Sequence, residues 1–305
     1  MISRVCIAAF YVFLPLEEEE LASLREELMA FGRIYAMRGL VLLAPEGING
    51  TVCGTAEAIA RWKERIVWLT GAIDFKDSEA GQEIFRRWSV KIKKEIVGLR
   101  QSGIRPQGKH RHVSPQEWQK ILEKEDVVLL DARNDYEVGI GKFRGAQNLG
   151  IHSFHEFPAY ARTAGIAKDK KILMYCTGGI RCEKALLVLE QEGYQDVHQL
   201  DGGILAYLQK FPHGNFEGEC FVFDERVAVD QELRPSQVFS LCPHCGDPAC
   251  AQTACGICGA RKAVCDACLQ EKTRQVCSKQ CAKKFSSEEN NTRASSVGKT
   301  LLQPF

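Results

Sequence analysis

The sequence lacks an apolar run long enough to cross a membrane. Every apolar stretch falls well short of the ~20 residues that a spanning helix needs. Residues 5–16 are apolar but run straight into Glu17-Glu-Glu-Glu20 without a small-residue cleavage site, so a first β-strand is expected there rather than a signal peptide. A net charge of +1 supplies no global field that would force a nucleic-acid partner. These absences favour a cytoplasmic protein with no membrane partner.

Cofactor signatures are also absent from the sequence. We find no dinucleotide fingerprint for NAD or flavin, and no convincing set of two histidines and one carboxylate for iron. The chain has 305 residues, 45% hydrophobic and 26% charged, which predicts two to three domains of a soluble globular protein. Its fourteen cysteines, without a secretion signal, indicate a reducing compartment in which thiols or metal sites replace disulfides.

Residues 1–100 are expected to form a separate small domain. The pattern predicts strands at 4–13, 33–44, 51–54 and 87–99, helices at 17–31 and 56–69, and a turn at 45–50. The resulting order βαββαβ is that of a ferredoxin-like or acylphosphatase-like sandwich. No residue in this part resembles catalytic machinery. Glu46 and Asn49 serve the turn in one interpretation and touch substrate in the other.

The most informative residues are Cys176-Thr-Gly-Gly-Ile-Arg181, which follow a short apolar strand and precede a helical pattern. Cys176 therefore lies on a tight loop at a helix N-terminus, where backbone N–H groups and the helix dipole stabilise a thiolate. Thr177, Gly178, Gly179 and Ile180 form the cradle around the sulfur. Arg181 closes the loop and is expected to hold an anionic group.

The length of this loop separates two chemistries. A cysteine phosphatase resembles the loop with one residue more, whereas the six-residue form resembles the active-site loop of rhodaneses, sized for a sulfur carried on the cysteine. Residues 113–215 resemble a rhodanese domain, an α/β fold with a parallel sheet and helices on both faces. Asp131 and Arg133 end a predicted buried strand, where structural support is favoured over a catalytic role.

Cys182 is a second candidate thiol, because it follows Arg181 directly in the first turn of the predicted helix. It is either a resolving cysteine that forms a disulfide with an oxidised Cys176 or a small buried helix residue. The sequence leaves both interpretations open.

A basic segment joins the first two domains, with residues 101–112 as a linker. From Arg86 to His112 nine lysines and arginines face a single acidic residue, Glu95. This density suits a phosphate backbone and predicts RNA contact, although a lysine-guarded edge strand also explains it. The candidate RNA-binding residues are Arg87, Lys91, Lys93, Lys94, Arg100, Arg105, Lys109 and Arg111.

The third signal is a cysteine-rich segment at residues 216–285, which is followed by a polar tail at 286–305 that we expect to be disordered. Nine of the fourteen cysteines lie between Cys242 and Cys281. Paired thiolates at this spacing predict two structural zinc sites of four cysteines each, with Cys250 left over. Alternating and sequential pairing both remain open. The candidate ligands are Cys242, Cys245, Cys255, Cys258, Cys265, Cys268, Cys277 and Cys281.

Together these motifs resemble the rhodanese-like tRNA uridine hydroxylases, which act on the wobble uridine at position 34. The resemblance rests on Ala44-Pro-Glu-Gly-Ile-Asn-Gly50, on the stretch from Met174 to Ala185, and on Phe221-Val-Phe-Asp-Glu-Arg226. It implies tRNA as partner, O2 as co-substrate, 5-hydroxyuridine as product, and Cys176 as the active-site cysteine that carries a persulfide.

The residues of the loop, taken without the resemblance, favour a different enzyme. They predict a sulfurtransferase in which the Cys176 thiolate takes up a sulfane sulfur and passes it on. A non-catalytic RNA-binding module is a third possibility, and a phosphatase is the least favoured. The sequence indicates neither the electron donor nor the oligomeric state.

Overall fold

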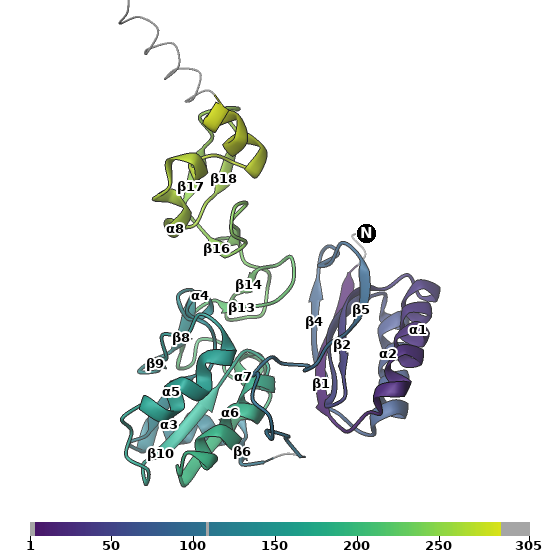
Figure 1. Cartoon of the computed structure of the whole chain (residues 1–305), viewed down its shortest axis with the longest axis vertical. Helices are drawn as coiled ribbons and strands as arrows, with labels where there is room; N and C mark the ends of the chain where they lie inside the picture. Colours follow the sequence, from purple (N-terminus) through teal and green to yellow (C-terminus); the bar gives the residue numbers. More distant parts are fainter. Residues whose placement is uncertain (1–3, 108–109, 288–305) are drawn as a thin grey trace, which may run out of the picture. The chain divides into compact units, whose positions relative to one another are not determined.

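The computed structural model describes residues 4–107 and 110–287. These residues divide into two compact units, with the boundary between Pro235 and Ser236. The first unit contains two sheets of five strands each (Figure 1). Within the described ranges, no helix is both long and apolar enough to span a bilayer.

The N-terminal domain is a five-stranded sheet with two helices on one face (Figure 1). Its elements are β1 (Val5–Phe13), α1 (Glu18–Ile34), β2 (Arg38–Ala44), β3 (Gly47–Gly54), α2 (Ala56–Thr70), β4 (Lys76–Ala80) and β5 (Trp88–Ile92). The strand order is β4-β1-β3-β2-β5, with β5 parallel to β2 and the other neighbours antiparallel. The acylphosphatase-like fold expected for this part is confirmed.

The structure differs from the sequence-based prediction in where strands lie. The fourth strand of the βαββαβ unit is β4, which the pattern missed because Lys76-Asp-Ser-Glu-Ala80 is almost entirely polar. The predicted strand at 87–99 ends at Ile92 and is an additional edge strand. Gly47–Gly50, predicted as a turn, already belongs to β3.

Apolar side chains of both helices fill the core of this domain. Trp62 of α2 is fully buried and packs against Phe10, Phe31 and Trp88, with ring centroids 5.3–6.0 Å apart. Helix α2 starts at Thr55, whose hydroxyl accepts a hydrogen bond from the Ala58 backbone N–H at 3.2 Å. The opposite face of the sheet, which includes Tyr11, remains available for other contacts.

The rhodanese domain is built on a second sheet, of order β6-β11-β10-β7-β9, whose strand pairs are all parallel. Its elements are β6 (His112–Val113), α3 (Pro115–Lys124), β7 (Val128–Asp131), α4 (Asp135–Val138), β8 (Gly141–Phe143), β9 (Gln147–Asn148), a 3-10 turn (Phe154–Glu156), α5 (Phe157–Thr163), β10 (Lys171–Tyr175), α6 (Ile180–Gln191), β11 (Asp196–Leu200) and α7 (Gly203–Lys210). The predicted parallel α/β fold is confirmed.

Both faces of this sheet are covered, as its apolar central strand requires. Alternate residues of β10 enter different cores: Ile172 and Met174 pack with α5 and α6, while Leu173 and Tyr175 pack with α3 and α7. Ser114 caps α3 by accepting a hydrogen bond from the Glu117 N–H at 3.2 Å, with Pro115 at the first helical position, as the sequence predicts.

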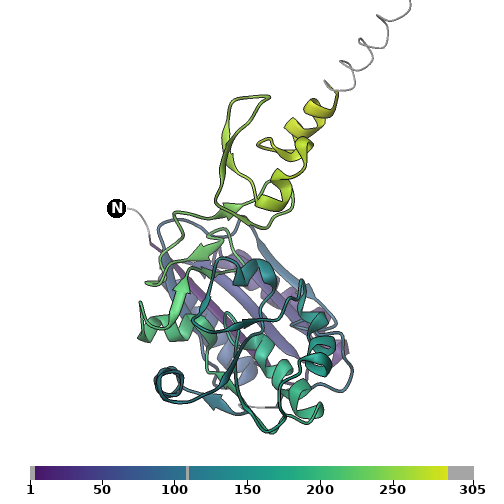
Figure 2. The same ribbon diagram turned by 90° about the vertical axis from the view of Figure 1, so that its left-hand side faces the viewer.

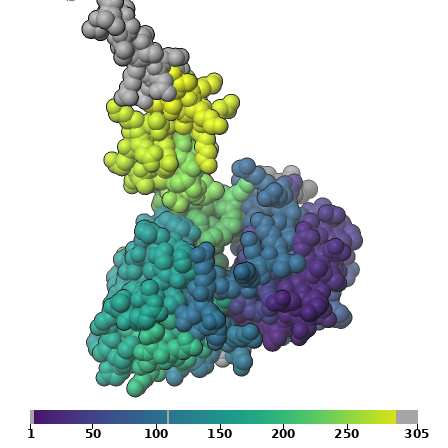
Figure 3. Space-filling model, viewed as in Figure 1, coloured from purple at the N-terminus to yellow at the C-terminus, as the bar shows by residue number. Residues whose placement is uncertain are grey.

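Residues 216–235 continue the first unit. Strand β12 (Phe216–Gly218) pairs with β8, and β13 (Cys220–Phe221) pairs with β14 (Ala228–Val229) in a hairpin. In Figure 3 the green atoms of this segment lie between the teal rhodanese domain and blue residues of the N-terminal domain. Contacts of the hairpin with Thr177 and Ser78 support this placement.

The second unit consists of short hairpins and helical turns, drawn in yellow in Figure 2. Its elements are β15 (Ser240–Leu241), β16 (Pro248–Ala249), β17 (Gln252–Ala254), β18 (Arg261–Ala263), α8 (Asp266–Leu269), a 3-10 turn (Lys272–Arg274) and helical residues 279–287. Its two small buried clusters contain four buried cysteines between them, and two partly buried cysteines pack against these clusters. Of the predicted tail, Ser286 and Ser287 are helical, and 288–305 lie outside the described residues.

Candidate active site

The Cys176 loop (residues 176–181) joins the carboxyl end of β10 to the start of α6. Open parallel sheets place their sites at this edge. Gly179 caps α6 with a left-handed backbone (φ 102°), and a Cβ there would lie 2.7 Å from the Tyr11 hydroxyl. Two features therefore exclude a side chain at this position: the left-handed backbone conformation and the steric clash with Tyr11. The Gly179 N–H, in turn, donates to Cys176 Sγ at 3.1 Å.

The loop stabilises Cys176 as a thiolate. The sulfur is fully buried, which by itself raises the pKa of the thiol. A hydrogen bond from the Cys182 side chain, the Arg181 charge and the backbone N–H groups of Cys182 and Arg181 outweigh burial and lower the pKa to about 6. At neutral pH the sulfur is therefore mostly an anion held by donors.

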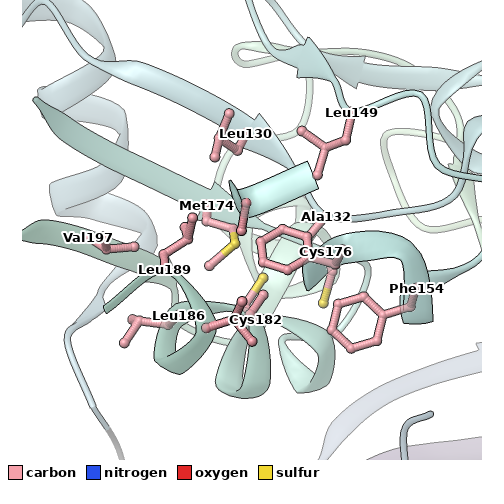
Figure 4. Packing of buried hydrophobic residues seen from close by; sticks show 14 of the residues in the cluster. Leu130, Ala132, Leu149, Phe154, Met174, Cys176, Cys182, Leu186, Leu189 and Val197 are labelled. Atoms are coloured by element: carbon pink, nitrogen blue, oxygen red, sulfur yellow. The ribbon is translucent and has the colours of Figure 1, made fainter. Parts of the chain in front are cut away.

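Cys182 faces the same buried space. Figure 4 shows its sulfur and that of Cys176 in one apolar cluster with Met174 and Phe154. Burial and the hydrogen bond to Cys176 raise the pKa of the Cys182 thiol well above its ordinary value. The two sulfurs thus form an unequal pair, in which a neutral thiol donates to a thiolate. That geometry is compatible with both interpretations of Cys182, as a resolving thiol and as a packing residue.

The Arg181 side chain is paired within the protein. Its guanidinium donates to both carboxylate oxygens of Glu137 at 2.5 and 2.7 Å, and Glu137 is fully buried. Burial lowers the pKa of Arg181, but the charge and hydrogen bonds of Glu137 outweigh burial and raise it. The Thr177 hydroxyl donates a hydrogen bond to the same carboxylate at 3.3 Å. Arg181 thus acts on Cys176 through its charge while Glu137 fixes its position.

Asp131 and Arg133 form a second buried bidentate ion pair, in addition to the pair of Arg181 and Glu137. Arg133 donates to the two Asp131 oxygens at 2.8 and 2.6 Å and to the Gly141 carbonyl at 2.6 Å. The Tyr175 hydroxyl also donates to Asp131, at 2.7 Å. Both ion-pair partners are fully buried, so the pair ties the ends of β7 and β10 to β8. This arrangement is compatible with structural support of the loop, and that role of Asp131 and Arg133 stays a prediction.

The N-terminal domain reaches this site through Tyr11. The Tyr11 hydroxyl donates to Glu183 Oε1 at 2.8 Å and lies over Gly179. Burial and the negative charge of Glu183 raise the pKa of Tyr11 well above its ordinary value, so the phenol stays protonated. Glu183 is also held by Gln199 at 2.9 Å and lies 3.1 Å from His112 Nε2.

Two lysines also cross between these domains. The Lys76 ammonium group of β4 lies 4.6 Å from the Tyr11 ring centroid, and the Lys76 Cε lies 3.8 Å from the position of a Cβ on Gly202 in the rhodanese domain. Burial lowers the pKa of Lys76. Lys184 of α6 is almost fully buried and contacts Glu46 at 2.8 Å and Glu95 at 2.6 Å. The Asn49 side-chain amide donates a hydrogen bond to the Ile96 carbonyl, and the Ile96 N–H donates one to the Glu46 carboxylate. Glu46 and Asn49 therefore hold the segment after β5, and Glu46 also holds Lys184.

Reasoning from the sequence attached no role to Tyr11, Lys76, Glu137 or Glu183. The only sequence signal for Glu137 is its position after the Asp131–Arg133 strand end, at a spacing like that of rhodaneses. Tyr11 and Lys76 are far from the loop along the chain, and no local pattern indicates contacts that form only when two domains pack together.

The predicted RNA-binding residues that the structure describes are exposed, and they do not all lie on one strand. Lys91 lies in β5, whereas Lys93 and Lys94 come after the end of that strand. The three lysines therefore do not share one strand face. Arg111 bonds the Gln195 carbonyl and lies 3.4 Å from Glu190. Lys109 is outside the described residues. The candidates that the structure describes are all exposed, and they are Arg87, Lys91, Lys93, Lys94, Arg100, Arg105 and Arg111.

The cysteine-rich unit contains two groups of four sulfurs that can each hold a metal ion. One comprises Cys242, Cys245, Cys265 and Cys268, and the other Cys255, Cys258, Cys277 and Cys281. Within each group the sulfurs lie within 4.8 Å of one another. The pairs alternate along the chain, which is one of the two arrangements that the spacing left open, and Cys250 belongs to neither group. Four cysteine sulfurs fit a tetrahedral structural zinc site.

Comparison with known proteins agrees with this architecture. Residues 5–96 match the UPF0176 acylphosphatase like domain, residues 114–210 the rhodanese-like domain, and residues 217–282 the rhodanase C-terminal family. Among solved structures, the rhodanese-like domain of the Alr3790 protein from Anabaena is similar at 21% identity with a TM-score of 0.31, over 36% of this chain and 80% of that one.

Curated relatives match most of the chain. The tRNA uridine(34) hydroxylase of Bdellovibrio bacteriovorus is 44% identical over 98% of this chain and 85% of its own length. The protein of the same name from Teredinibacter turnerae is also 44% identical, over 81% of this chain and 78% of its own. With this identity across all three domains, the chain belongs to the tRNA uridine(34) hydroxylase family.

Proposed function

We propose that this chain is a tRNA-modifying oxidoreductase that hydroxylates uridine 34, with Cys176 as its reactive group and O2 as co-substrate. The observation that carries the proposal is the Cys176 thiolate. The Cys182 side chain, the Arg181 charge and the backbone N–H groups of both residues lower its pKa to about 6 despite burial, and the Gly179 N–H donates to its sulfur at 3.1 Å. The relatives named for this activity match 98% and 81% of the chain, which supports the same substrate class.

In this proposal the Cys176 sulfur, or a persulfide on it, adds to the uracil ring. Addition of a nucleophile to an electron-poor ring carbon makes the neighbouring carbon electron-rich, and that carbon then takes up oxygen. One oxygen atom stays on that carbon as a hydroxyl. Loss of the proton from the same carbon and breakage of the carbon–sulfur bond then restore the ring double bond and release the sulfur nucleophile unchanged. Reduction of the other to water consumes two electrons and two protons, which a separate reductant supplies.

The buried position of Cys176 adds a condition. Its sulfur is fully covered, so the side chains around it have to move before a base can reach it. A persulfide would extend the reactive atom beyond the cradle by one sulfur. Tyr11 and Lys76 come from a different domain than the loop, so a small shift between the domains changes the cover of the site.

We also propose that the two four-cysteine groups bind structural zinc, and that the exposed basic residues after β5 contact the tRNA backbone. Zinc bound there supplies folding energy rather than chemistry, because four cysteines leave no open position. Exposed lysines and arginines neutralise phosphates without reading sequence. A tRNA substrate and fourteen cysteines that form no disulfide support a cytoplasmic location.

The experiment is mass spectrometry of nucleosides in tRNA from cells that lack this protein. The cells are complemented with the wild type, with Cys176→Ala, or with Cys250→Ala as a matched control, since Cys250 is an exposed cysteine outside both metal groups. We expect 5-hydroxyuridine-derived nucleosides with the wild type and with Cys250→Ala only. Formation at the normal rate with Cys176→Ala would refute the role of the thiolate. Unchanged oxygenated uridines with fewer thiolated nucleosides would instead indicate sulfur transfer.

A further inference from the structure

The hairpin of residues 220–229, the Phe223 hairpin, contains a sequence motif to which the mechanism assigns no role. Phe221, Val222, Val227 and Ala228 are buried, whereas Phe223 exposes 60% of its surface. An isolated exposed phenylalanine on a loose loop would be unremarkable. Here the rest of the hairpin is unusually constrained, so the exposure of this single ring calls for a physical reason.

Internal bonds fix the shape of the hairpin. Asp224 and Arg226 form a fork at 2.8 and 2.6 Å, with side chains only 2% and 8% exposed. The Val222 N–H donates to the Val227 carbonyl at 2.9 Å. Val227 has a left-handed backbone, with φ of 64°, which is sterically unfavourable for a β-branched residue. Such strain persists only where the surroundings hold it, and it gathers at functional sites.

External contacts attach the hairpin to both domains. Arg226 donates to the Ser78 hydroxyl at 3.2 Å, and the Glu225 N–H donates to the Ile84 carbonyl at 3.0 Å. On the other side, Thr177 of the Cys176 loop lies 3.5 Å from the Phe221 carbonyl oxygen, and the Phe221 ring packs edge-on against Tyr136 at 5.3 Å. The hairpin is therefore held in one position by both domains and is not a flexible loop.

The exposed ring of the Phe223 hairpin lies next to the Cys176 loop. Phe223 packs edge-on against Phe221, with centroids 5.0 Å apart and planes at 86°. The Arg181 guanidinium carbon, in the last residue of the Cys176 loop, is 5.7 Å from the Phe223 ring centroid. Two residues after Phe223, Glu225 forms an ion pair with Arg86 at 2.6 Å, and the Arg86 side chain is 88% exposed. An open aromatic ring with an exposed cation nearby is the combination with which proteins hold an unpaired nucleotide.

We propose that Phe223 is a stacking platform for the uracil base of the substrate, which holds the base beside the Cys176 loop, while Arg86 contacts a flanking phosphate. The inference rests on the proposed function, because it takes the substrate to be a nucleotide in RNA. Uracil presents a flat π-face, and an enzyme that acts on a base has to hold it out of its stack. Phe223 makes no bond to the reacting atoms and is a positioning residue.

The test measures binding of the full chain to a uridine-34 anticodon stem–loop and to the same loop with an abasic residue at that position. Stacking of one base on an aromatic ring corresponds to roughly a fivefold to hundredfold change in affinity upon replacement by alanine. We expect Phe223→Ala to lose that factor for the uridine loop and to bind the abasic loop like the wild type. Phe223→Leu, which keeps apolar area but lacks a flat ring, should resemble the alanine variant.

Two further variants sharpen the test. Phe223→Trp should keep the affinity, and its added fluorescence should be quenched by the uridine loop more than by the abasic loop. Trp68→Ala is the matched control, because Trp68 is also an exposed ring (76%) next to an arginine, Arg65 at 4.2 Å, but lies on helix α2. It should bind both loops like the wild type.

Equal binding of both loops by the wild type, an equal loss on both loops in Phe223→Ala, or no loss at all would overturn the platform. These outcomes are separate from failure of the proposed function, which appears as wild-type protein that forms no 5-hydroxyuridine.

Discussion

Removal of the Cys182 thiol should raise the pKa of Cys176, because the Cys182 side chain is the strongest single donor to the thiolate. A hydrogen bond to a charged group contributes about 1.5–3 kcal/mol, and a thiol is a weak donor, so the lower end applies. One pKa unit corresponds to about 1.36 kcal/mol. We therefore expect the Cys176 pKa to rise by about one unit in Cys182→Ala, from about 6 in the wild type.

The assay is the pH profile of alkylation of the Cys176 peptide, followed by mass spectrometry so that the other cysteines do not interfere. The midpoint of the profile is the informative quantity. A rate at one pH is a poor measure, because a thiolate of higher pKa is also a better nucleophile and the two effects offset each other. Cys182→Ser keeps a donor at this position and should titrate near the wild-type midpoint. An unchanged midpoint in Cys182→Ala, or equal shifts in both variants, would refute the hydrogen-bond account.

Three further outcomes are expected. Glu137→Ala leaves Arg181 buried without its partner and should lower the free energy of unfolding by about 3–5 kcal/mol in urea titrations, and a loss below about 1 kcal/mol would contradict a buried pair. Burial lowers the pKa of His112, but Asp201 and Glu183 outweigh burial and raise it to about 9, above its ordinary 6.5. Its stabilisation is then complete below pH 6.5 and lost as pH rises through 9, so the stability difference between wild type and His112→Gln should shrink over that range. A strong chelator should unfold residues 236–287, seen as rapid proteolysis there with residues 4–235 still protected, whereas unchanged protection would argue against bound metal.

Several features of this protein follow from local sequence alone. A glycine loop between an apolar strand and a helix has few possible shapes, so the position of Cys176 at a helix N-terminus was predictable from Lys171–Arg181. Cysteine pairs at ligand spacing predicted four-sulfur groups, because short spacing brings two thiolates to one ion whatever the rest of the chain does. The capping serine before α3 is a similar case, since its partner N–H lies three residues away.

Tertiary structure decided the remaining features. Strand β4 was invisible because it is an edge strand with a polar sequence, and only its pairing with β1 defines it. Alternating rather than sequential pairing of the cysteines depends on how the hairpins fold back, which spacing does not determine.

The same holds for the surroundings of Cys176. Arg181 could be predicted beside the sulfur, but its pairing with Glu137, 44 residues away, could not. The approach of Tyr11 to Glu183 and the mounting of Phe223 next to Arg181 both join segments that no local pattern links. Local sequence therefore determined the reactive group, because its chemistry depends on nearby backbone. The packing of domains decided what covers and tunes that group, because those contacts exist only once distant segments meet.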